Sequence, residues 1–436
     1  MPNSAIFHRD FKARPFWWEA YEPKALAEAA LPKEARVVIV GAGYAGLSAA
    51  LELNREGLDC IVLDANEPGF GASTRNGGMV SGGVNVGKRY MAKAITPEES
   101  APVLADAADA FGLIEELIAR EKIDCGWTRA GYFVGAWCKG HFEGMAKKVD
   151  MLNRYARSEA FLVPPERQRE EIGSDYYRGG MVIGRAAHLH PALYFKGLLD
   201  LCGKRGIAIA SKTPASRIAQ SGTGWQVETP RGTIQAGDVI IATNGYTGDV
   251  TPQLKRRVVP VGSYIIATEE LAPDLAAGIS PKNRSIADTR RVLTYYRMSP
   301  DGKRLIFGGR AKFGHTDPVE TAHILHGFMT DRFPQLRGSK ITHAWTGNVA
   351  FTLDEIPHMG KFDNLHYALG CNGSGVAMMT YLGHQSARKI AGKVNRVCAF
   401  DRPEFPDHPL YNGSTWFLPW IGRYFRSRDW IDRQFG

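Results

Sequence analysis

The chain contains 436 residues, of which 44% are hydrophobic and 23% are charged. This balance is close to that of ordinary globular proteins and excludes a disordered or fibrous chain, and the length leaves room for about two or three domain-sized units. The formal net charge of +9 comes from basic residues spread along the chain, so we expect no nucleic-acid-binding tail. The charge suits small anionic ligands or an anionic surface, and equally ordinary solubility.

The chain lacks the sequence features of membrane-spanning, secreted and metal-binding proteins. No apolar run approaches the roughly 18 residues that a membrane span needs, and the first residues, MPNSAIFHRDFKARP, lack the apolar stretch of a secretory signal. The six cysteines are scattered without a CxxC pair, and His188-Leu189-His190 has no third ligand at a useful spacing. We therefore expect a cytoplasmic protein with free thiols and no metal.

The first regular elements form a strand–helix–strand unit around a glycine cluster. A β-branched run at 36–40 predicts a strand, apolar spacing over 47–57 predicts a helix, and the run at 60–63 predicts a second strand. Between the first strand and the helix lies GAGYAG, which matches GxGxxG, and Asp64 follows about 20 residues later. Together these features are the fingerprint of an adenine-dinucleotide site.

Each fingerprint position has a physical task. Gly41 permits a tight turn, Gly43 lets a pyrophosphate approach the helix N-terminus, and Gly46 allows the helix to pack closely on the strand. Asp64 would accept hydrogen bonds from ribose hydroxyls. The motif alone does not separate NAD from FAD.

A second glycine cluster, GASTRNGGM at 71–79, follows closely behind the first. A tightly held flavin extends far beyond one phosphate loop, and glycines without a Cβ allow close backbone contact elsewhere. This cluster therefore favours FAD, with Ser73 and Thr74 as hydrogen-bond donors to the phosphate or ribityl chain. The alternative is a plain surface turn.

Further elements alternate between helical and strand patterns. Helical spacing recurs over 97–120 and 140–157, a short strand and a helix follow within 176–207, and a hairpin feeds a buried strand at 239–242. The section 258–307 alternates as an antiparallel sheet, and a strand, a glycine loop and a helix end the pattern. We expect an α/β fold in which a Rossmann-like FAD-binding domain carries an inserted α+β substrate domain on a mainly antiparallel sheet. The predicted ranges are 1–95, 180–255 and 340–436 for the FAD-binding domain, and 96–179 and 256–339 for the substrate domain.

Several motifs together resemble one family. GAGYAG, Asp64, GASTRNGGM, ATNGY, AWTG with TLDEIPHMG, and GCNGSGVAM resemble the FAD-dependent amino-acid and amine oxidoreductases related to D-amino-acid oxidase, above all their γ-glutamylputrescine-oxidase-like branch. The resemblance runs over nearly the whole chain. It implies noncovalent FAD and oxidation of a C–N bond by hydride transfer to flavin N5, with the imine hydrolysed to a carbonyl compound and an amine. Oxygen or a quinone would accept the electrons. The FAD contacts that it and the fingerprint imply are Gly41, Gly43, Tyr44, Ala45, Gly46, Asp64, Ala65, Ser73, Thr74, Arg75, Asn76, Gly77, Gly78, Met79, Ala242, Thr243, Gly245, Gly370, Asn372, Gly373, Gly375 and Val376.

The chain departs from the family pattern where a substrate carboxylate is usually held. Relatives often carry an arginine in W-x-G-x-R-P, where this chain has Val349, and sarcosine oxidases place a lysine where it has Ala377. A buried carboxylate needs another partner, because an unpaired buried anion is costly. The predicted candidates for substrate binding are Arg297, Tyr295, Tyr296, Tyr264 and Arg75. Arg297 has the alternative of being a surface strand residue.

The substrate and the function class stay open at this level. An N-substituted glycine such as iminodiacetate or sarcosine, or glycine itself, suits the basic balance, whereas a polyamine conjugate such as γ-glutamylputrescine suits the absent arginine. The rival classes are a NAD-dependent dehydrogenase and a flavin carrier without turnover. The amphipathic tail, WFLPWIGRYFRSRDWIDRQF, predicts either a terminal helix docked on its own domain or a peripheral contact with the inner face of the membrane.

Overall fold

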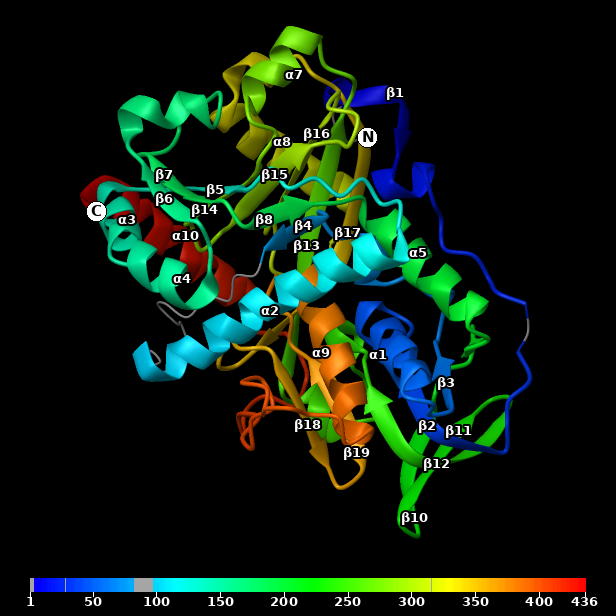
Figure 1. The fold of residues 1–436 in the computed structure, drawn as a ribbon. Coiled ribbons are helices and arrows are strands. Elements are labelled where there is room, and N and C mark those ends of the chain that lie inside the picture. The colour runs from blue at the N-terminus through cyan, green and yellow to red at the C-terminus, as the bar shows by residue number, and fades with distance from the viewer. Residues whose placement is uncertain (1–3, 28, 82–96, 315) are drawn as a thin grey trace.

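A computed structural model describes residues 4–27, 29–81, 97–314 and 316–436, which build two mixed sheets with helices around them (Figure 1). The lower sheet in Figure 1 has eight strands in the order β10-β11-β12-β2-β3-β9, with β19 pairing with β12 and β18 pairing with β19. Its strands are β2 (Glu34–Val40), β3 (Cys60–Leu63), β9 (Ala208–Ala210), β10 (Arg217–Ser221), β11 (Gly224–Thr229), β12 (Gly232–Ile241), β18 (His358–Phe362) and β19 (Leu365–Leu369).

The centre of this sheet is parallel, because β12, β2, β3 and β9 run in one direction and β19 joins β12 in parallel. Parallel strands are buried on both faces, which explains the continuous apolar runs at 36–40 and 60–63. Helices α1 (Tyr44–Arg55) and α9 (Gly375–Ile390) pack against each other in front of the sheet, while α2 (Pro97–Glu121) contacts α9 and α5 (Pro191–Lys204) contacts α1 (Figure 1).

The upper sheet has nine strands in the order β1-β17-β13-β16-β15-β14-β5-β7-β6. All of its pairings are antiparallel except β1 with β17 and β14 with β5. Its strands are β1 (Phe7–Lys12), β5 (Tyr132–Gly135), β6 (Ala160–Val163), β7 (Gly180–Ile183), β13 (Val258–Thr268), β14 (Ser285–Asp288), β15 (Thr294–Met298), β16 (Leu305–Gly309) and β17 (Ile341–Thr352). Helix α8 (Pro318–Arg332) packs on β13, β16 and β17.

The remaining elements connect or cover the two sheets. A short ribbon of two antiparallel strands lies between them. These elements are β4 (Met79–Ser81) and β8 (Ala186–His188) of the ribbon, α3 (Lys139–Ala146), α4 (Val149–Ala156), α6 (Pro252–Lys255), α7 (Pro273–Ile279) and α10 (Leu418–Phe435). Within the described ranges, no helix is both long and apolar enough to cross a membrane.

The structure bears out the predicted fold class and most of the predicted elements. The helical pattern at 140–157 forms two helices, α3 and α4, that separate at residues 147–148. The predicted division into domains stays a prediction. The strands β1, β7 and β17 fall in ranges assigned to the FAD-binding domain but pair in the nine-stranded sheet, and α2 falls in a range assigned to the substrate domain but packs on α9.

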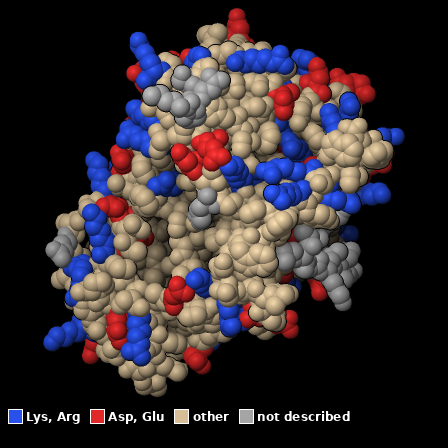
Figure 2. Space-filling model, turned by 180° about the vertical axis from the view of Figure 1, so that it is seen from behind, with Lys and Arg blue, Asp and Glu red and all other residues tan. Residues whose placement is uncertain are grey.

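The surface charge is dispersed, as the sequence suggests. On the face shown in Figure 2, Lys and Arg side chains lie in small groups separated by acidic and uncharged residues. This arrangement agrees with basic residues that are spread along the chain.

Candidate functional site

A large cavity of about 540 Å³ opens where the parallel strands of the lower sheet end, and the upper sheet forms its opposite wall. The last residues of β2, β3 and β12, which are Val40, Leu63 and Ile241, all line it. The carboxyl ends of parallel strands are where doubly wound folds bind nucleotide ligands, and the volume lies within the range of small-molecule sites.

The first glycine cluster holds the start of α1 against this cavity. A Cβ on Gly41, whose φ is +108°, would lie 2.8 Å from the Ala242 carbonyl oxygen, and a Cβ on Gly46 would lie 1.9 Å from the Gly41 carbonyl oxygen. Gly43 lines the cavity, and a Cβ there would approach only Ser73 Oγ, at 3.0 Å. The structure thus leaves Gly43 as the position where a ligand could approach the backbone at the helix N-terminus.

Asp64 lies at the end of β3 with both carboxylate oxygens in use. Its Oδ2 accepts the Ala42 N–H at 2.8 Å and its Oδ1 accepts the Asn66 N–H at 2.9 Å, and burial raises the pKa of the carboxyl group above its usual value. Each oxygen has a further lone pair that could accept a ribose hydroxyl. Residues 213–215 line the same end of the cavity, and their motif, TPA, carried no signal in the sequence.

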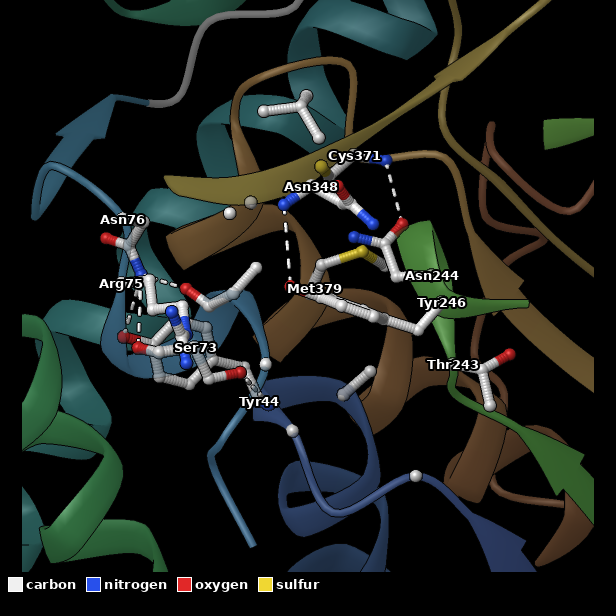
Figure 3. Close-up of a pocket in the computed structure, with 18 of the residues that line it drawn as sticks. Tyr44, Ser73, Arg75, Asn76, Thr243, Asn244, Tyr246, Asn348, Cys371 and Met379 are labelled. Carbon is white, nitrogen blue, oxygen red and sulfur yellow. Dashed lines mark hydrogen bonds between the residues drawn. The ribbon is translucent and has the colours of Figure 1, made fainter. Parts of the chain in front are cut away.

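The second glycine cluster divides its residues between the cavity and the loop itself. Ser73 lines the cavity and its Oγ accepts the Tyr44 N–H at 3.1 Å (Figure 3). Thr74 is fully buried away from the cavity, where its Oγ1 donates to the Gly69 carbonyl oxygen at 2.8 Å and accepts the Trp18 Nε1–H at 2.9 Å. Thr74 therefore shapes the loop and is not a contact for a ligand.

Asn76 and its neighbours fix the turn that follows. The Asn76 side chain donates to the Ala72 and Ser73 carbonyl oxygens, each at 3.1 Å, and accepts the Gly78 N–H at 2.8 Å. Asn76, Gly77 and Met79 line the cavity. Gly78 does not; its φ is +68° and a Cβ there would lie 2.1 Å from the Leu189 carbonyl oxygen.

The Arg75 guanidinium lines the cavity between two aromatic rings. Its Cζ lies 4.6 Å from the centroid of Trp18 and 4.5 Å from that of Phe70, and its Nε donates to the Phe70 carbonyl oxygen at 2.7 Å. Burial lowers the pKa of Arg75. The guanidinium keeps its positive charge, because arginine is not deprotonated in proteins.

Asn244 joins two loops that the sequence places far apart. Its Oδ1 accepts the N–H groups of Gly370, at 3.0 Å, and Cys371, at 3.4 Å (Figure 3). In the first loop Ala242 and Thr243 line the cavity, whereas Gly245 packs behind against Asn348.

The late glycine loop leads into α9 at the cavity. Asn372, Gly373, Gly375 and Val376 line it, so that the helix begins at its wall. Gly370 lies behind, where a Cβ would be 2.2 Å from Thr352 Cγ2. Cys371 also lines the cavity, as its place in the late glycine loop suggests. Lining residues that were not predicted include Asn244, Tyr246 and Ser374 of these loops and Asn348 of β17.

Three of the predicted substrate contacts lie away from the cavity. Arg297 is 1% exposed; its Nε donates to the Gly77 carbonyl oxygen at 2.9 Å and its Nη2 to the Leu189 carbonyl oxygen at 2.7 Å, and burial lowers its pKa to about 9. The hydroxyls of Tyr296 and Tyr177 lie 2.9 Å apart in the core of the upper sheet. Tyr264 Oη donates to the Gly314 carbonyl oxygen. Arg297 Nη1 is buried without a hydrogen-bond partner among the described residues, but none of the three residues lines the cavity, so we do not assign them to a substrate.

Tyr295 and an arginine that the sequence did not single out face the cavity together. Tyr295 Oη lies 2.8 Å from Ser263 Oγ, and all three of Tyr295, Ser263 and Arg310 line the cavity. Burial raises the pKa of Tyr295 to about 12, and the Ser263 hydrogen bond and the positive charge of Arg310 oppose that rise. The sequence signal for this wall is Gly308-Gly309-Arg310 at the end of β16. A Cβ on Gly308 would lie 2.5 Å from the Tyr295 ring, so glycine leaves room for that ring.

The fold and the glycine-lined cavity fit a flavin-dependent oxidoreductase, and the comparisons with known proteins identify the family. The family model described as FAD dependent oxidoreductase (DAO) matches residues 36–389, which is most of the chain. The chain therefore belongs to the FAD dependent oxidoreductase family, as its motifs predicted, and is an enzyme of the amino-acid and amine oxidase and dehydrogenase group.

Individual proteins within this family resemble the chain in sequence or in structure. The chain is 33% identical over 398 residues to gamma-glutamylputrescine oxidoreductase of Escherichia coli (strain K12), covering 90% of this chain and 92% of that protein. Among solved structures, glycine oxidase from Geobacillus kaustophilus has a TM-score of 0.72 at 18% identity, with 87% of this chain and 99% of that chain covered. Iminodiacetate oxidase from Chelativorans sp. BNC1 has a TM-score of 0.66 at 18% identity, with 83% and 97% covered. At such identities the two structures establish the fold alone.

Proposed function

We propose that the protein oxidises a C–N bond in a small amine or amino acid that carries a carboxylate, with noncovalently bound FAD. The observation that carries the proposal is that Arg310 and the hydrogen-bonded pair of Tyr295 and Ser263 line the same cavity as the dinucleotide fingerprint, on the wall formed by the upper sheet. FAD, when bound, supplies a ring that accepts hydride at N5. The residues of the chain position the substrate against it.

The residues that line the cavity fit an extended dinucleotide. Asp64 offers acceptors for a ribose, and the N-terminus of α1 at Gly43 offers N–H groups for a pyrophosphate. The predicted contacts that line the cavity are Gly41, Gly43, Tyr44, Ala45, Asp64, Ala65, Ser73, Arg75, Asn76, Gly77, Met79, Ala242, Thr243, Asn372, Gly373, Gly375 and Val376. We infer that the other predicted glycines, Gly46, Gly78, Gly245 and Gly370, support these contacts from behind.

The charges around the cavity favour a substrate with a carboxylate. Among the described lining residues, the charged ones are Asp64, Arg75 and Arg310. Asp64 belongs to the fingerprint end, so the wall formed by the upper sheet carries positive charge. Arg310 Nη1 donates to the Arg291 carbonyl oxygen at 3.1 Å, and its Cζ lies 4.6 Å from the centroid of Phe351, which holds the side chain in place. A positioned guanidinium suits carboxylate recognition.

No described side chain on the upper-sheet wall of the cavity is a base that could take a proton from the substrate nitrogen. Tyr295 keeps its proton at neutral pH, because its pKa is raised to about 12, and its hydroxyl can donate to a carboxylate. Histidine and lysine do not occur among the described lining residues. We infer that the substrate binds with its amine already neutral and that the protein contributes orientation and exclusion of water.

Two substrate classes carry the required carboxylate. N-substituted glycines place it beside the reacting carbon, and the basic wall of the cavity supports them. γ-Glutamylputrescine carries it at the far end of a longer chain, and the 33% identity to gamma-glutamylputrescine oxidoreductase favours this second candidate.

The test begins with the purified protein, which we expect to be yellow and to release its flavin into the supernatant on acid precipitation. Anaerobic mixing with iminodiacetate, sarcosine, glycine or γ-glutamylputrescine should bleach the flavin band near 450 nm with one of them. Matched amides or esters, which lack the carboxylate, should bleach it far more slowly. Flavin that stays in the precipitate contradicts noncovalent binding, and a yellow protein that no member of the panel bleaches contradicts the proposed reaction.

A further inference from the structure

The C-terminal helix α10 is fixed to the upper sheet by one face only. The carboxylate of Asp429 accepts the N–H groups of Arg291 and Val292, each at 2.9 Å, and pairs with the Arg291 guanidinium at 3.2 Å. The Phe425 ring lies 5.8 Å from the Phe313 ring, centroid to centroid. The helix therefore docks on its own chain, as one of the two sequence interpretations predicted.

The opposite face of α10 presents large aromatic side chains to solvent. We define the α10 surface as Trp416, which precedes the helix, together with Trp420, Arg423, Tyr424, Trp430, Ile431 and Phe435. The exposed fraction is 63% for Trp420, 59% for Tyr424, 61% for Trp430 and 81% for Phe435. Trp420, Tyr424 and Ile431 recur at the spacing of one helical face and form an apolar stripe that Ser427 interrupts. Such a large exposed patch marks a site of interaction.

The charges beside this stripe have one sign. Arg423 is exposed, and its Cζ lies 4.9 Å from the centroid of Trp420. Arg426 is also exposed, but it lies at the edge of the docked face, where its Nη2 donates to the Ala311 carbonyl oxygen at 3.0 Å. The two carboxylates of the helix turn inward, because Asp429 is 2% exposed and Asp432 pairs with Arg291. The α10 surface therefore combines exposed aromatic rings and cations without an exposed carboxylate of its own.

We propose that the α10 surface docks the enzyme on an anionic lipid bilayer, with the helix lying in the plane of the interface. Trp and Tyr prefer the boundary between headgroups and acyl chains, and arginines beside them attract anionic headgroups. A second copy of the chain fits less well, because a symmetric contact would set the arginines of one copy against those of the other with no exposed acid on the helix to pair with them.

The experiment is co-sedimentation of the flavin-loaded protein with phosphatidylcholine vesicles that contain or lack phosphatidylglycerol. We expect the protein to pellet with the anionic vesicles at low salt and to be released at high salt. The triple variant Trp420→Ser, Tyr424→Ser, Ile431→Ser should lose at least about tenfold in partitioning, because it removes most of the apolar stripe. Its flavin content and its amine-dependent bleaching should match the wild type, since none of these residues lines the cavity.

The matched control is Val397→Ser, which removes another exposed apolar side chain, 75% exposed, outside α10. This variant should pellet as the wild type does. Wild-type protein that stays in the supernatant with anionic vesicles overturns the proposal, and so does a triple variant that pellets unchanged. Light scattering in the absence of vesicles shows whether the surface instead joins two copies, which would also overturn it.

Discussion

Arg297 lies in β15 and Arg310 directly follows the neighbouring strand β16, yet their surroundings give them different tasks. Arg297 is enclosed by backbone and the Trp17 ring, with its guanidinium bound to the carbonyl oxygens of Gly77 and Leu189. Arg310 follows the end of β16 and reaches the cavity wall. A buried arginine that binds carbonyl oxygens stabilises the chain, whereas one on a cavity wall can bind an anion.

Replacement of Arg310 tests the carboxylate site. Arg310→Met should raise KM for a carboxylate substrate about 10- to 100-fold with a smaller change in kcat, because one charge-assisted hydrogen bond of about 1.5–3 kcal/mol is lost from binding. Steady-state kinetics with a substrate and its amide measure the effect, and the amide should respond little. Arg310→Lys should recover part of the affinity. Equal losses for both compounds would show that Arg310 does not bind the carboxylate.

Replacement of Arg297 should instead lower stability. Arg297→Met leaves two buried carbonyl oxygens without their donors, and each should cost about 1–3 kcal/mol in the free energy of unfolding. Urea unfolding of the purified protein measures the change. Arg9→Met is the control, because Arg9 has an 88% exposed side chain and should change stability by less than about 0.5 kcal/mol. A stable Arg297→Met protein with a raised KM would return Arg297 to the list of substrate contacts.

The sequence could predict which strand faces the cavity, but not which side chain reaches it. Tyr295 and Arg297 are two residues apart, so a strand pattern puts them on the same face, and Tyr295 does line the cavity. Arg297 is screened by the backbone at Gly77 and Leu189, from segments far away in the chain. No local pattern reports such a contact.

At the scale of elements, replacements of two of the three glycines in the first cluster, Gly46 and Gly43, should affect folding and cofactor binding separately. Gly46→Ala should destabilise the protein, because its Cβ would lie 1.9 Å from a backbone oxygen that cannot move aside. Gly43→Ala should fold but bind FAD at least about tenfold more weakly, because the only near atom is a rotatable hydroxyl while the methyl group enters the cavity. Flavin fluorescence titration and thermal unfolding measure the two effects.

Gly203→Ala is the control for the Gly46→Ala and Gly43→Ala variants. Gly203 lies near the end of α5 with no atom within 4 Å of its Cβ position, so Gly203→Ala should keep flavin affinity and leave stability unchanged or slightly higher. Gly43→Ala protein that binds FAD as the wild type does would contradict the assignment of the α1 N-terminus to the pyrophosphate.

Local elements were the most predictable part of the chain, because their signals are local. The strand at 60–63 was predicted with the bounds that β3 has, and the fingerprint loop leads into a helix as expected, although α1 begins at Tyr44 rather than at 47. That earlier start matters, because it brings the N-terminus of α1 to the cavity. The apolar spacing marks the buried stripe of a helix, whereas its first residue is set by the glycine turn before it.

At the scale of the whole molecule, pairings between distant segments make the cavity and are the part that the sequence could not provide. β17 pairs with β13 on one side and with β1 on the other, and β1 lies near the beginning of the described chain. It also contacts the turn at Asn244–Tyr246, so that one strand connects the upper sheet to the lower one. Strand patterns predict that a sheet exists, whereas the neighbour of each strand depends on the whole fold.

Two histidines between the sheets should make the whole fold sensitive to acid. His188 ends β8 and His190 caps α5, where its Nδ1 accepts the Leu193 N–H at 3.3 Å, and burial lowers their pKa to about 3 and about 4. Because histidine in the unfolded chain has a pKa of about 6.5, the unfolded state takes up protons first as the pH falls. The free energy of unfolding should therefore be highest above about pH 6.5 and decrease from there towards about pH 4, with His190 contributing on the order of 2–3 kcal/mol to this decrease.

His190→Asn keeps an acceptor at the helix cap but does not titrate, so urea unfolding at several pH values should show a shallower decrease in the free energy of unfolding for this variant. An unchanged slope would mean that His190 has the same pKa in the folded and the unfolded chain, and the acid sensitivity would then have to come from other groups.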